Sequence, residues 1–261
     1  DKYPTADPTL SRGPVATDYS PTTSPDQEYV AFASDRDGNW EIYLTKVDNS
    51  DTRRITFNSS AKDLDPMWSP TGQFVVYESD RDGNWNLYVL DINSGAEIPV
   101  TNNAADDINA AWSPDGRSLV FQSNRSGQWQ LFTLDLTNMQ ETPLSDGKGS
   151  DLDALFSPDG NHLLFRSLRD GQSSTVYVSN RDGSNLVQIS NPAGDALNQS
   201  WSPDGSLIAY QSDMEGDQDI YVYEFSTNLT RVVTNNNVAD YAPAWGCGGT
   251  SLLFTSDVMG D

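Results

Sequence analysis

The sequence is poor in the residues on which many catalytic and structural sites depend. Its 261 residues include one cysteine and one histidine. A single cysteine excludes an internal disulfide and any metal site built from several cysteines. The one histidine, His162, leaves a Ser-His-Asp triad a single place to form, and no Gly-x-Ser-x-Gly motif accompanies any serine. We therefore expect a protein that is not an enzyme.

Basic residues and long apolar runs are also scarce. The chain carries 15 lysines and arginines against 38 aspartates and glutamates, which gives a formal net charge of −23. Nucleic acids and anionic membrane surfaces would be repelled by such a charge. No stretch approaches the roughly 20 consecutive apolar residues that a membrane helix needs. The composition thus predicts no nucleic-acid partner and no membrane insertion. Cations, basic proteins and neutral ligands remain as candidate partners.

A short turn motif recurs along the chain. Ser-Pro-Asp or a close variant begins at five positions spaced by 44 or 45 residues, and a degenerate sixth copy begins at Gly246. The five positions are Ser24, Ser69, Ser113, Ser157 and Ser202. A period of roughly 40–45 residues is typical of the four-stranded blades of a β-propeller. The spacing therefore predicts an all-β fold built from blades.

Each repeat shows the same succession of turns and strands. In Ser-Pro-Asp-Gly the proline fixes φ and the glycine supplies a positive φ, which predicts a tight hairpin turn. Strand-forming runs follow, at residues 29–32, 41–44 and 54–56 in the first repeat. A short apolar stretch that ends in an aromatic residue precedes each turn and supplies another strand. Since no segment has a helical period, we predict four-stranded antiparallel blades.

The two ends of the chain contain parts of one further repeat. The sixth repeat stops after residues 252–257, with two strands made, while residues 1–3 and 10–21 match the strands that are missing. We therefore predict one domain over residues 1–261, a six-bladed β-propeller whose ring is closed by a sixth blade shared between the N- and C-termini, two strands each. Closure removes open sheet edges. Alternatively, the half-blades pair between molecules, which would give a homo-oligomer or a filament.

Two repeats share a longer signature. Ser-Asp-Arg-Asp-Gly-Asn follows the second strand at residues 34–39 and again at 79–84, and Ile-Tyr or Leu-Tyr comes soon after it. Together with the Ser-Pro-Asp-Gly turn, this succession resembles the repeats of the TolB-type, WD40-like propeller family over essentially the whole chain. The resemblance implies a recognition module of a periplasmic or extracellular protein. It also implies a protein or peptide as the partner.

An aspartate stands six residues before the Ser-Pro turn in five of the six repeats. The five are Asp18, Asp63, Asp107, Asp151 and Asp240, whereas Ala196 takes the place in the fifth repeat. In a propeller these residues would recur around one mouth of the central channel, where a cation would relieve their repulsion. Oxygen ligands alone point to Ca²⁺. Alternatively, each aspartate accepts hydrogen bonds from loop amides and fixes the entry to the strand; both roles can hold together.

Polar residues two positions further on are predicted to continue this lining. They are Ser20, Asp65, Asn109, Asp153 and Asn198.

Two sets of tryptophans recur with the repeat. Trp40, Trp85 and Trp129 follow the turn after the second strand, where they could form an exposed band for a partner or pack between neighbouring blades. Trp68, Trp112, Trp201 and Trp245 precede the Ser-Pro turn, and we expect them in the core.

The sequence thus predicts a non-enzymatic scaffold that binds a protein or peptide, with Ca²⁺ as the candidate cation at the channel mouth and no other cofactor. Two alternatives remain open. One is a self-assembling extracellular structural protein built from propeller subunits. The other is a polysaccharide hydrolase or lyase that uses carboxylates, although nothing among the 38 acidic residues singles out a pair.

Overall fold

All regular structure in the protein is β-strand. The computed structural model describes residues 16–169, 171, 173–246 and 248–257, and within these ranges every element is a strand. No helix in them is long and apolar enough to cross a membrane. The predicted all-β fold class is confirmed.

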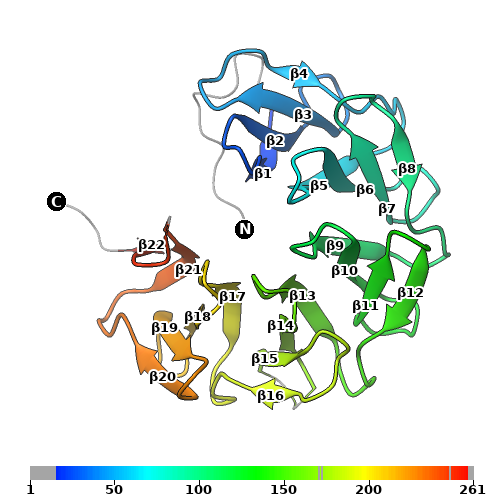
Figure 1. The fold of residues 1–261 in the computed structure, drawn as a ribbon. Helices are drawn as coiled ribbons and strands as arrows, with labels where there is room; N and C mark the ends of the chain where they lie inside the picture. The colour runs from blue at the N-terminus through cyan, green and yellow to red at the C-terminus, as the bar shows by residue number, and fades with distance from the viewer. Residues whose placement is uncertain (1–15, 170, 172, 247, 258–261) are drawn as a thin grey trace. The chain divides into compact units, whose positions relative to one another are not determined.

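Antiparallel sheets follow one another along the chain, and each corresponds to one sequence repeat (Figure 1). The first repeat contains β1 (Asp18–Thr23), β2 (Tyr29–Ser34), β3 (Glu41–Lys46) and β4 (Arg53–Arg54). The second contains β5 (Asp63–Trp68), β6 (Phe74–Ser79), β7 (Asn86–Asp91) and β8 (Glu97–Pro99). The third contains β9 (Asp107–Trp112), β10 (Ser118–Ser123), β11 (Gln130–Asp135) and β12 (Gln140–Pro143).

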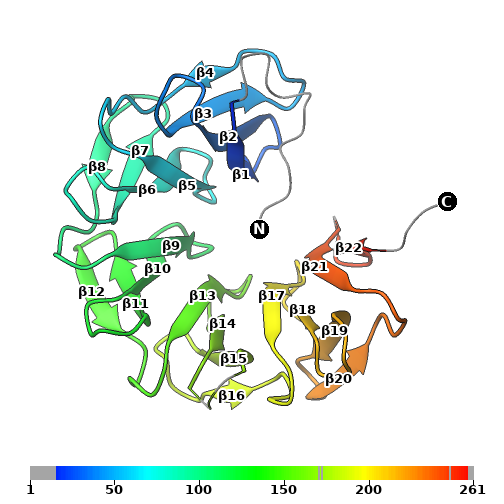
Figure 2. The same cartoon turned by 180° about the vertical axis from the view of Figure 1, so that it is seen from behind.

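The remaining repeats continue the series, as the same sheets seen from behind in Figure 2 show. The fourth contains β13 (Asp151–Phe156), β14 (His162–Ser167), β15 (Thr175–Asn180) and β16 (Val187–Gln188). The fifth contains β17 (Ala196–Trp201), β18 (Leu207–Ser212), β19 (Asp219–Glu224) and β20 (Leu229–Val232). The sixth contains β21 (Asp240–Trp245) and β22 (Leu252–Ser256).

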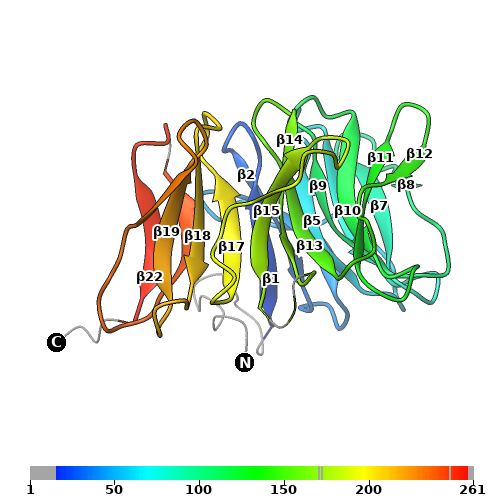
Figure 3. The same cartoon turned by 90° about the horizontal axis from the view of Figure 1, so that it is seen from below.

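The strands in each sheet lie in the order of the sequence. In the fifth repeat, for example, β17, β18, β19 and β20 are successive antiparallel neighbours, and Figure 3 shows β17, β18 and β19 side by side. Four-stranded antiparallel blades are therefore confirmed for the first five repeats. Six complete blades and a closed ring stay predictions, because residues 1–3 and 10–11 of the proposed shared blade lie outside the described residues.

The chain divides into two compact units. One comprises residues 1–125 and 134–140, and the other comprises 126–133 and 141–261. In the first unit, strand β5 of the second repeat packs against β1 and β2 of the first. In the second unit, β17 packs against β14 and β15, and β21 packs against β17 and β18. Within each unit, neighbouring sheets thus pack against one another, as stacked layers of strands require.

The repeated turns have the predicted geometry. In the second repeat the Gly72 amide donates to the Ser69 carbonyl at 3.0 Å, and Gly72 has a φ of 72°. In the third repeat the Asp115 carboxylate accepts the Ser113 hydroxyl at 2.6 Å and the Arg117 amide at 3.1 Å. Side-chain and backbone bonds therefore close the turn together, which explains why the motif recurs at every first hairpin.

The predicted core tryptophans divide into two groups. Trp68 and Trp112 are buried, and each indole donates to a carbonyl of the preceding repeat, Thr22 and Met67 respectively. Trp201 and Trp245 are half-buried. Trp201 nevertheless packs against a buried cluster that includes Ile208 and Tyr210, as a core position requires.

Candidate recognition site

The five predicted aspartates begin the first strands of their repeats. Asp63, Asp107 and Asp240 are 0% exposed and Asp151 is 1% exposed, whereas Asp18 is half-buried. The backbone amides of three of them donate, each at 2.9 Å, to a tryptophan carbonyl of the preceding repeat. The acceptors for Asp63, Asp107 and Asp151 are Trp40, Trp85 and Trp129 respectively. The aspartates therefore stand where one repeat is joined to the next.

Four of the aspartates bind an arginine that lies 18 residues further along the chain. The pairs and their N···O distances are Asp18–Arg36 at 2.8 Å, Asp63–Arg81 at 3.3 Å, Asp107–Arg125 at 3.1 Å and Asp151–Arg169 at 2.9 Å. In each, the arginine Nε also donates to a serine hydroxyl, from Ser34, Ser79, Ser123 and Ser167 respectively. Each guanidinium lies over an aromatic ring as well. The buried carboxylates thus receive their counter-charge inside their own repeat.

These ion pairs bear on the predicted calcium site. A guanidinium that neutralises a carboxylate removes most of the repulsion that a cation would relieve. Within the described ranges, no group of three or more aspartate, glutamate, histidine or cysteine side chains is placed to hold a metal ion. The proposed role in fixing the strand entry has direct support, whereas calcium at these aspartates stays a prediction.

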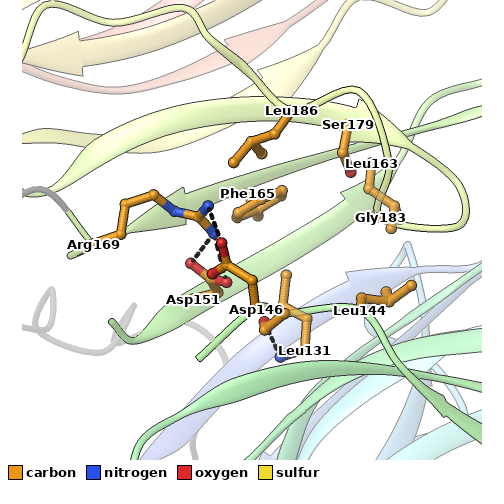
Figure 4. A pocket seen from close by; sticks show the side chains of 11 residues that line it. Leu131, Leu144, Asp146, Asp151, Leu163, Phe165, Arg169, Ser179, Gly183 and Leu186 are labelled. Atoms are coloured by element: carbon orange, nitrogen blue, oxygen red, sulfur yellow. Dashed lines mark hydrogen bonds and ion pairs between the residues drawn. The ribbon is translucent and has the colours of Figure 1, made fainter. Parts of the chain in front are cut away.

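The fourth repeat shows how completely the arginine fills its place (Figure 4). Arg169 reaches Asp151 and also lies 3.5 Å from the Asp146 carboxylate. Its guanidinium carbon lies 5.1 Å from the centre of the Tyr177 ring. The pocket that remains around it measures only about 100 Å³ and is bounded by Leu163 and other apolar side chains. The arginine therefore closes the pocket of its own repeat.

The predicted partner-binding tryptophans Trp40, Trp85 and Trp129 are half-buried. Trp40 packs against a buried cluster that draws Ala33 and Ile42 from the first repeat and Tyr77, Tyr88 and Leu90 from the second. Trp40 therefore packs between neighbouring sheets, as the second of the two sequence interpretations has it. A role of the three tryptophans in partner binding stays a prediction.

The fifth repeat departs from this pattern at both ends of the ion pair. Ala196 replaces the aspartate and Met214 replaces the arginine. The serine that binds the arginine Nε in the first four repeats is retained as Ser212, and its hydroxyl is buried without a hydrogen-bond partner. The Tyr221 hydroxyl is also buried without a partner, whereas the corresponding Tyr88 hydroxyl binds Asp82. An unpaired buried hydroxyl costs free energy, about 1–3 kcal/mol in proteins, so both require an explanation.

A pocket opens at this point in the fifth repeat. It measures about 620 Å³ and is bounded by apolar and aromatic side chains together with one carboxylate. They include Ile189, Pro192, Tyr210, Met214, Glu215, Tyr221 and Val232. The Tyr210 and Tyr221 rings are stacked, with centroids 5.6 Å apart and planes inclined by 15°. Burial, followed by the Glu215 carboxylate, raises the pKa of Tyr221 to about 12, so its hydroxyl remains a neutral donor.

One carboxylate that lines this pocket, Glu215, belongs to an acidic cluster of the fifth and sixth repeats. Burial raises the pKa of Asp219, and the carboxylates of Asp217, Asp240 and Glu215 raise it further. Buried oxygens of Asp217 and Asp240 have no hydrogen-bond partner. In the described part of the chain no ion pair involves any of these four residues. A cation that enters this region would meet an uncompensated negative field.

The predicted polar lining has an unusual backbone. Its members share a positive φ of 47–54°, at the position where the register of each first strand shifts; they are Ser20, Asp65, Asn109, Asp153 and Asn198. Ala242 has the same conformation in the sixth repeat, with a φ of 49°. A left-handed residue in a strand forms a bulge that redirects its side chain. Asn, Asp and Ser tolerate it better than bulkier residues, which explains why small polar residues recur here.

In the second repeat this backbone places two acids together. Burial raises the pKa of Glu78 to about 8, and the Asp65 carboxylate adds to the rise. The Ser20 hydroxyl donates to Asp65, and the Asn109 amide donates to Glu78 Oε1 at 2.7 Å. The surroundings of Glu78 therefore favour its protonated, neutral form. Gln211 stands in its place in the fifth repeat and accepts the Ala242 amide at 2.8 Å.

The single histidine packs against an aromatic ring. His162 begins β14, and its ring lies edge-on to Phe225 with centroids 5.1 Å apart. Its backbone amide donates to the Ser157 hydroxyl at 2.9 Å. This contact belongs to the Ser-Pro-Asp-Gly turn and involves none of the ring nitrogens that a catalytic triad would use.

Sequence reasoning missed the arginines and the pocket. The arginines could have been found, because each of the four follows its aspartate at the same distance of 18 residues and the fifth repeat loses both residues together. The pocket could not, since its walls come from the fourth-to-fifth connection, β18, β19 and β20.

Comparisons with known proteins agree with the repeat. The sequence matches the family described as the TolB beta propeller domain over residues 11–104, 63–145 and 86–191. The protein TolB homolog of Chlorobaculum tepidum is 31% identical over 86 residues, which covers 33% of this chain. The matched segment spans 20% of that relative's length.

Solved structures show the same fold at low identity. A putative TolB from Agrobacterium tumefaciens has a TM-score of 0.69 and 21% identity, with 84% of this chain and 80% of that chain covered. An oligogalacturonate lyase in complex with manganese has a TM-score of 0.72 and 18% identity, with 90% and 70% covered. At such identities the likeness extends to the fold alone.

Proposed function

This chain belongs to the TolB beta propeller domain family, and we propose that it is a periplasmic or extracellular scaffold that binds a protein or peptide and catalyses no reaction. The location and the kind of partner rest on the relatives, one of which is a Tol-Pal system protein TolB from Desulfosudis oleivorans. Because that relative is matched over only 20% of its length, its own partners are not carried over to this chain.

The observation that carries the proposal is the pocket of the fifth repeat. In four repeats an arginine of the chain itself occupies the corresponding place, whereas in the fifth the place is open and its buried hydroxyls are unpaired. An apolar pocket with a few unpaired polar groups is the usual form of a binding site.

The surrounding charge favours a basic partner over an acidic sugar. The net charge of −23 attracts basic peptides and repels polyanions such as polygalacturonate. The Glu215 carboxylate lines the pocket without an ion-pair partner among the described residues, and it strengthens this preference locally. A lyase that acts on acidic polysaccharides would have to overcome the same field.

One experiment measures peptide binding and polygalacturonate cleavage on the same sample. Short fluorescent peptides of graded net charge are titrated against the domain by anisotropy, and polygalacturonate is incubated with the same sample while unsaturated product is followed by ultraviolet absorbance. We expect saturable binding that strengthens with peptide charge. Turnover of polygalacturonate without peptide binding would contradict the proposal, and light scattering on the same sample would reveal assembly through shared blades.

A further inference from the structure

The second repeat shows how this fold holds an arginine. Arg81 lies over the Tyr88 ring, with its guanidinium carbon 4.0 Å from the ring centre. Its NH2 nitrogen donates to the Tyr77 hydroxyl at 2.8 Å, and its Nε donates to the Ser79 hydroxyl at 2.9 Å. Asp63 and Glu97 supply the negative charge. Two stacked tyrosines, a serine and nearby carboxylates thus form a complete guanidinium site.

The fifth repeat keeps the uncharged residues of this site, the two stacked tyrosines and the serine. The same strand register places Tyr210 opposite Tyr221, as it places Tyr77 opposite Tyr88. Ser212 ends β18 as Ser79 ends β6. What is missing is the arginine. The Ser212 hydroxyl stands where the Ser79 hydroxyl accepts the Arg81 Nε, and it is buried without a partner. The Tyr221 hydroxyl, which is also buried without a partner, stands where the Tyr88 hydroxyl binds Asp82.

The negative charge in the fifth repeat comes from different residues. Ala196 and Thr230 stand where the second repeat has Asp63 and Glu97, so the two direct carboxylates are lost. Glu215 supplies a carboxylate that lines the pocket. Glu215 forms no ion pair among the described residues, so its negative charge is available to a positive group.

A planar organic cation fits this arrangement better than a metal ion. The walls are stacked aromatic rings and aliphatic side chains, which attract a guanidinium through cation–π contact and stacking. Within the described residues no three metal-ligating side chains converge. A guanidinium also supplies several N–H groups, which the Tyr210 and Ser212 oxygens can accept as Tyr77 and Ser79 accept those of Arg81.

We propose that the pocket of the fifth repeat receives an arginine side chain of the partner, in the place that an arginine of the chain itself occupies in the first four repeats. This inference rests on the proposed function and names the chemical group that the scaffold recognises. The first four repeats thus fill this guanidinium site with their own arginine, and the fifth repeat leaves it for an arginine of the partner.

The first experiment compares three peptides that differ in one side chain. Acetyl-Gly-Arg-Gly amide and its lysine and citrulline analogues are titrated into the labelled domain, and amide shifts are followed by NMR, which detects weak binding. We expect the arginine peptide to shift the amides of β18 and β19 and to bind about tenfold more tightly than citrulline, which has the same shape without the charge. Equal binding of all three, or no shifts in these strands, would overturn the inference.

Variants then separate recognition from folding. The double substitution Ala196→Asp with Met214→Arg fills the pocket as in the second repeat and should weaken binding of the arginine peptide by about 100-fold. Tyr210→Phe removes the hydroxyl that corresponds to the one Arg81 reaches on Tyr77, and it should weaken binding roughly tenfold. Tyr221→Phe removes an unpaired hydroxyl that corresponds to the one Tyr88 directs to Asp82, so it should weaken binding less and leave the melting temperature unchanged or higher. Glu215→Gln should weaken binding, and Glu224→Gln, an exposed carboxylate of the same repeat outside the pocket, is the matched control.

The outcomes distinguish this inference from the proposed function. If basic peptides bind but the double variant binds them as well as the wild type does, the scaffold function stands and the arginine pocket is refuted. If no peptide binds and polygalacturonate is consumed, both are refuted. Selective loss of arginine binding in the double variant supports both.

Discussion

The second and fifth repeats have the same strand pairing but differ in the side chains that lie beside their paired tyrosines. Tyr77 pairs with Tyr88 in one and Tyr210 pairs with Tyr221 in the other, in identical strand registers. Yet the second repeat holds a buried aspartate–arginine pair, and the fifth has Ala196 and Met214 at the same positions. The ion pair is therefore not required for the four-stranded sheet, because the fifth repeat forms that sheet without it. Hydrogen-bonded strands and apolar burial determine the sheet, and the pair determines what occupies the space beside it.

The largest expected effect follows from breaking the pair in the second repeat. Arg81→Met leaves the fully buried Asp63 without its counter-charge, and we expect a loss of roughly 3–5 kcal/mol in the free energy of unfolding. Chemical denaturation followed by tryptophan fluorescence measures it. Arg81→Met combined with Asp63→Ala, which copies the fifth repeat, should cost less than Arg81→Met alone. A double variant as unstable as the single would show that the arginine stabilises by packing rather than by charge.

The reverse change in the fifth repeat tests the same rule. Ala196→Asp alone places a carboxylate in a fully buried position without a counter-charge, and we expect it to cost about 3 kcal/mol. Adding Met214→Arg should recover most of that loss, because the guanidinium would then meet Ser212 and Tyr221 as well. The comparison is read from denaturation midpoints of wild type, single and double variants. Failure of the arginine to restore stability would mean that the pocket cannot hold a guanidinium.

These repeats also show how far sequence reasoning reaches. The Ser-Pro-Asp-Gly turns and the strands beside them are local features, so the all-β class and the four-stranded sheets were predictable from spacing and turn chemistry. The burial of Trp68 and the half-exposure of Trp201 depend on neighbouring sheets, which a pattern within one repeat does not contain. The pocket arises where two substitutions, at residues 196 and 214, meet only after folding, so the sequence pattern showed Ala196 merely as an exception to the repeat.

The second and fifth repeats also differ in how the stability of the fold depends on pH, because Glu78 of the second repeat is replaced by Gln211 in the fifth. Glu78 has a folded-state pKa of about 8 against an ordinary value of 4.5, so folding favours its protonated form. Its contribution to stability is therefore full below pH 4.5 and is lost progressively as the pH rises from 4.5 to 8. We expect a loss of about 2 kcal/mol across this window, less than the full linkage value of about 1.4 kcal/mol per pH unit, because water reaches buried charges.

Glu78→Gln introduces the residue that the fifth repeat already has and keeps the oxygen that accepts the Asn109 amide. It should therefore be more stable than the wild type above pH 8 and similar to it near pH 4.5. Thermal melts across this range measure the difference. Parallel pH profiles for the two proteins would assign the pH dependence to other groups, such as the neighbouring Asp65.

The smallest expected effect concerns calcium. Four of the five predicted ligands already bind an arginine, whereas Asp240 forms no ion pair among the described residues and has one buried oxygen without a partner. We therefore expect Ca²⁺ to raise the melting temperature by no more than about 2 °C, which corresponds to about 1 kcal/mol or less. Asp240→Asn should remove that rise, and Asp107→Asn should leave it in place. A larger rise that survives Asp240→Asn would place the cation at the paired aspartates after all, and would require calcium to displace their arginines.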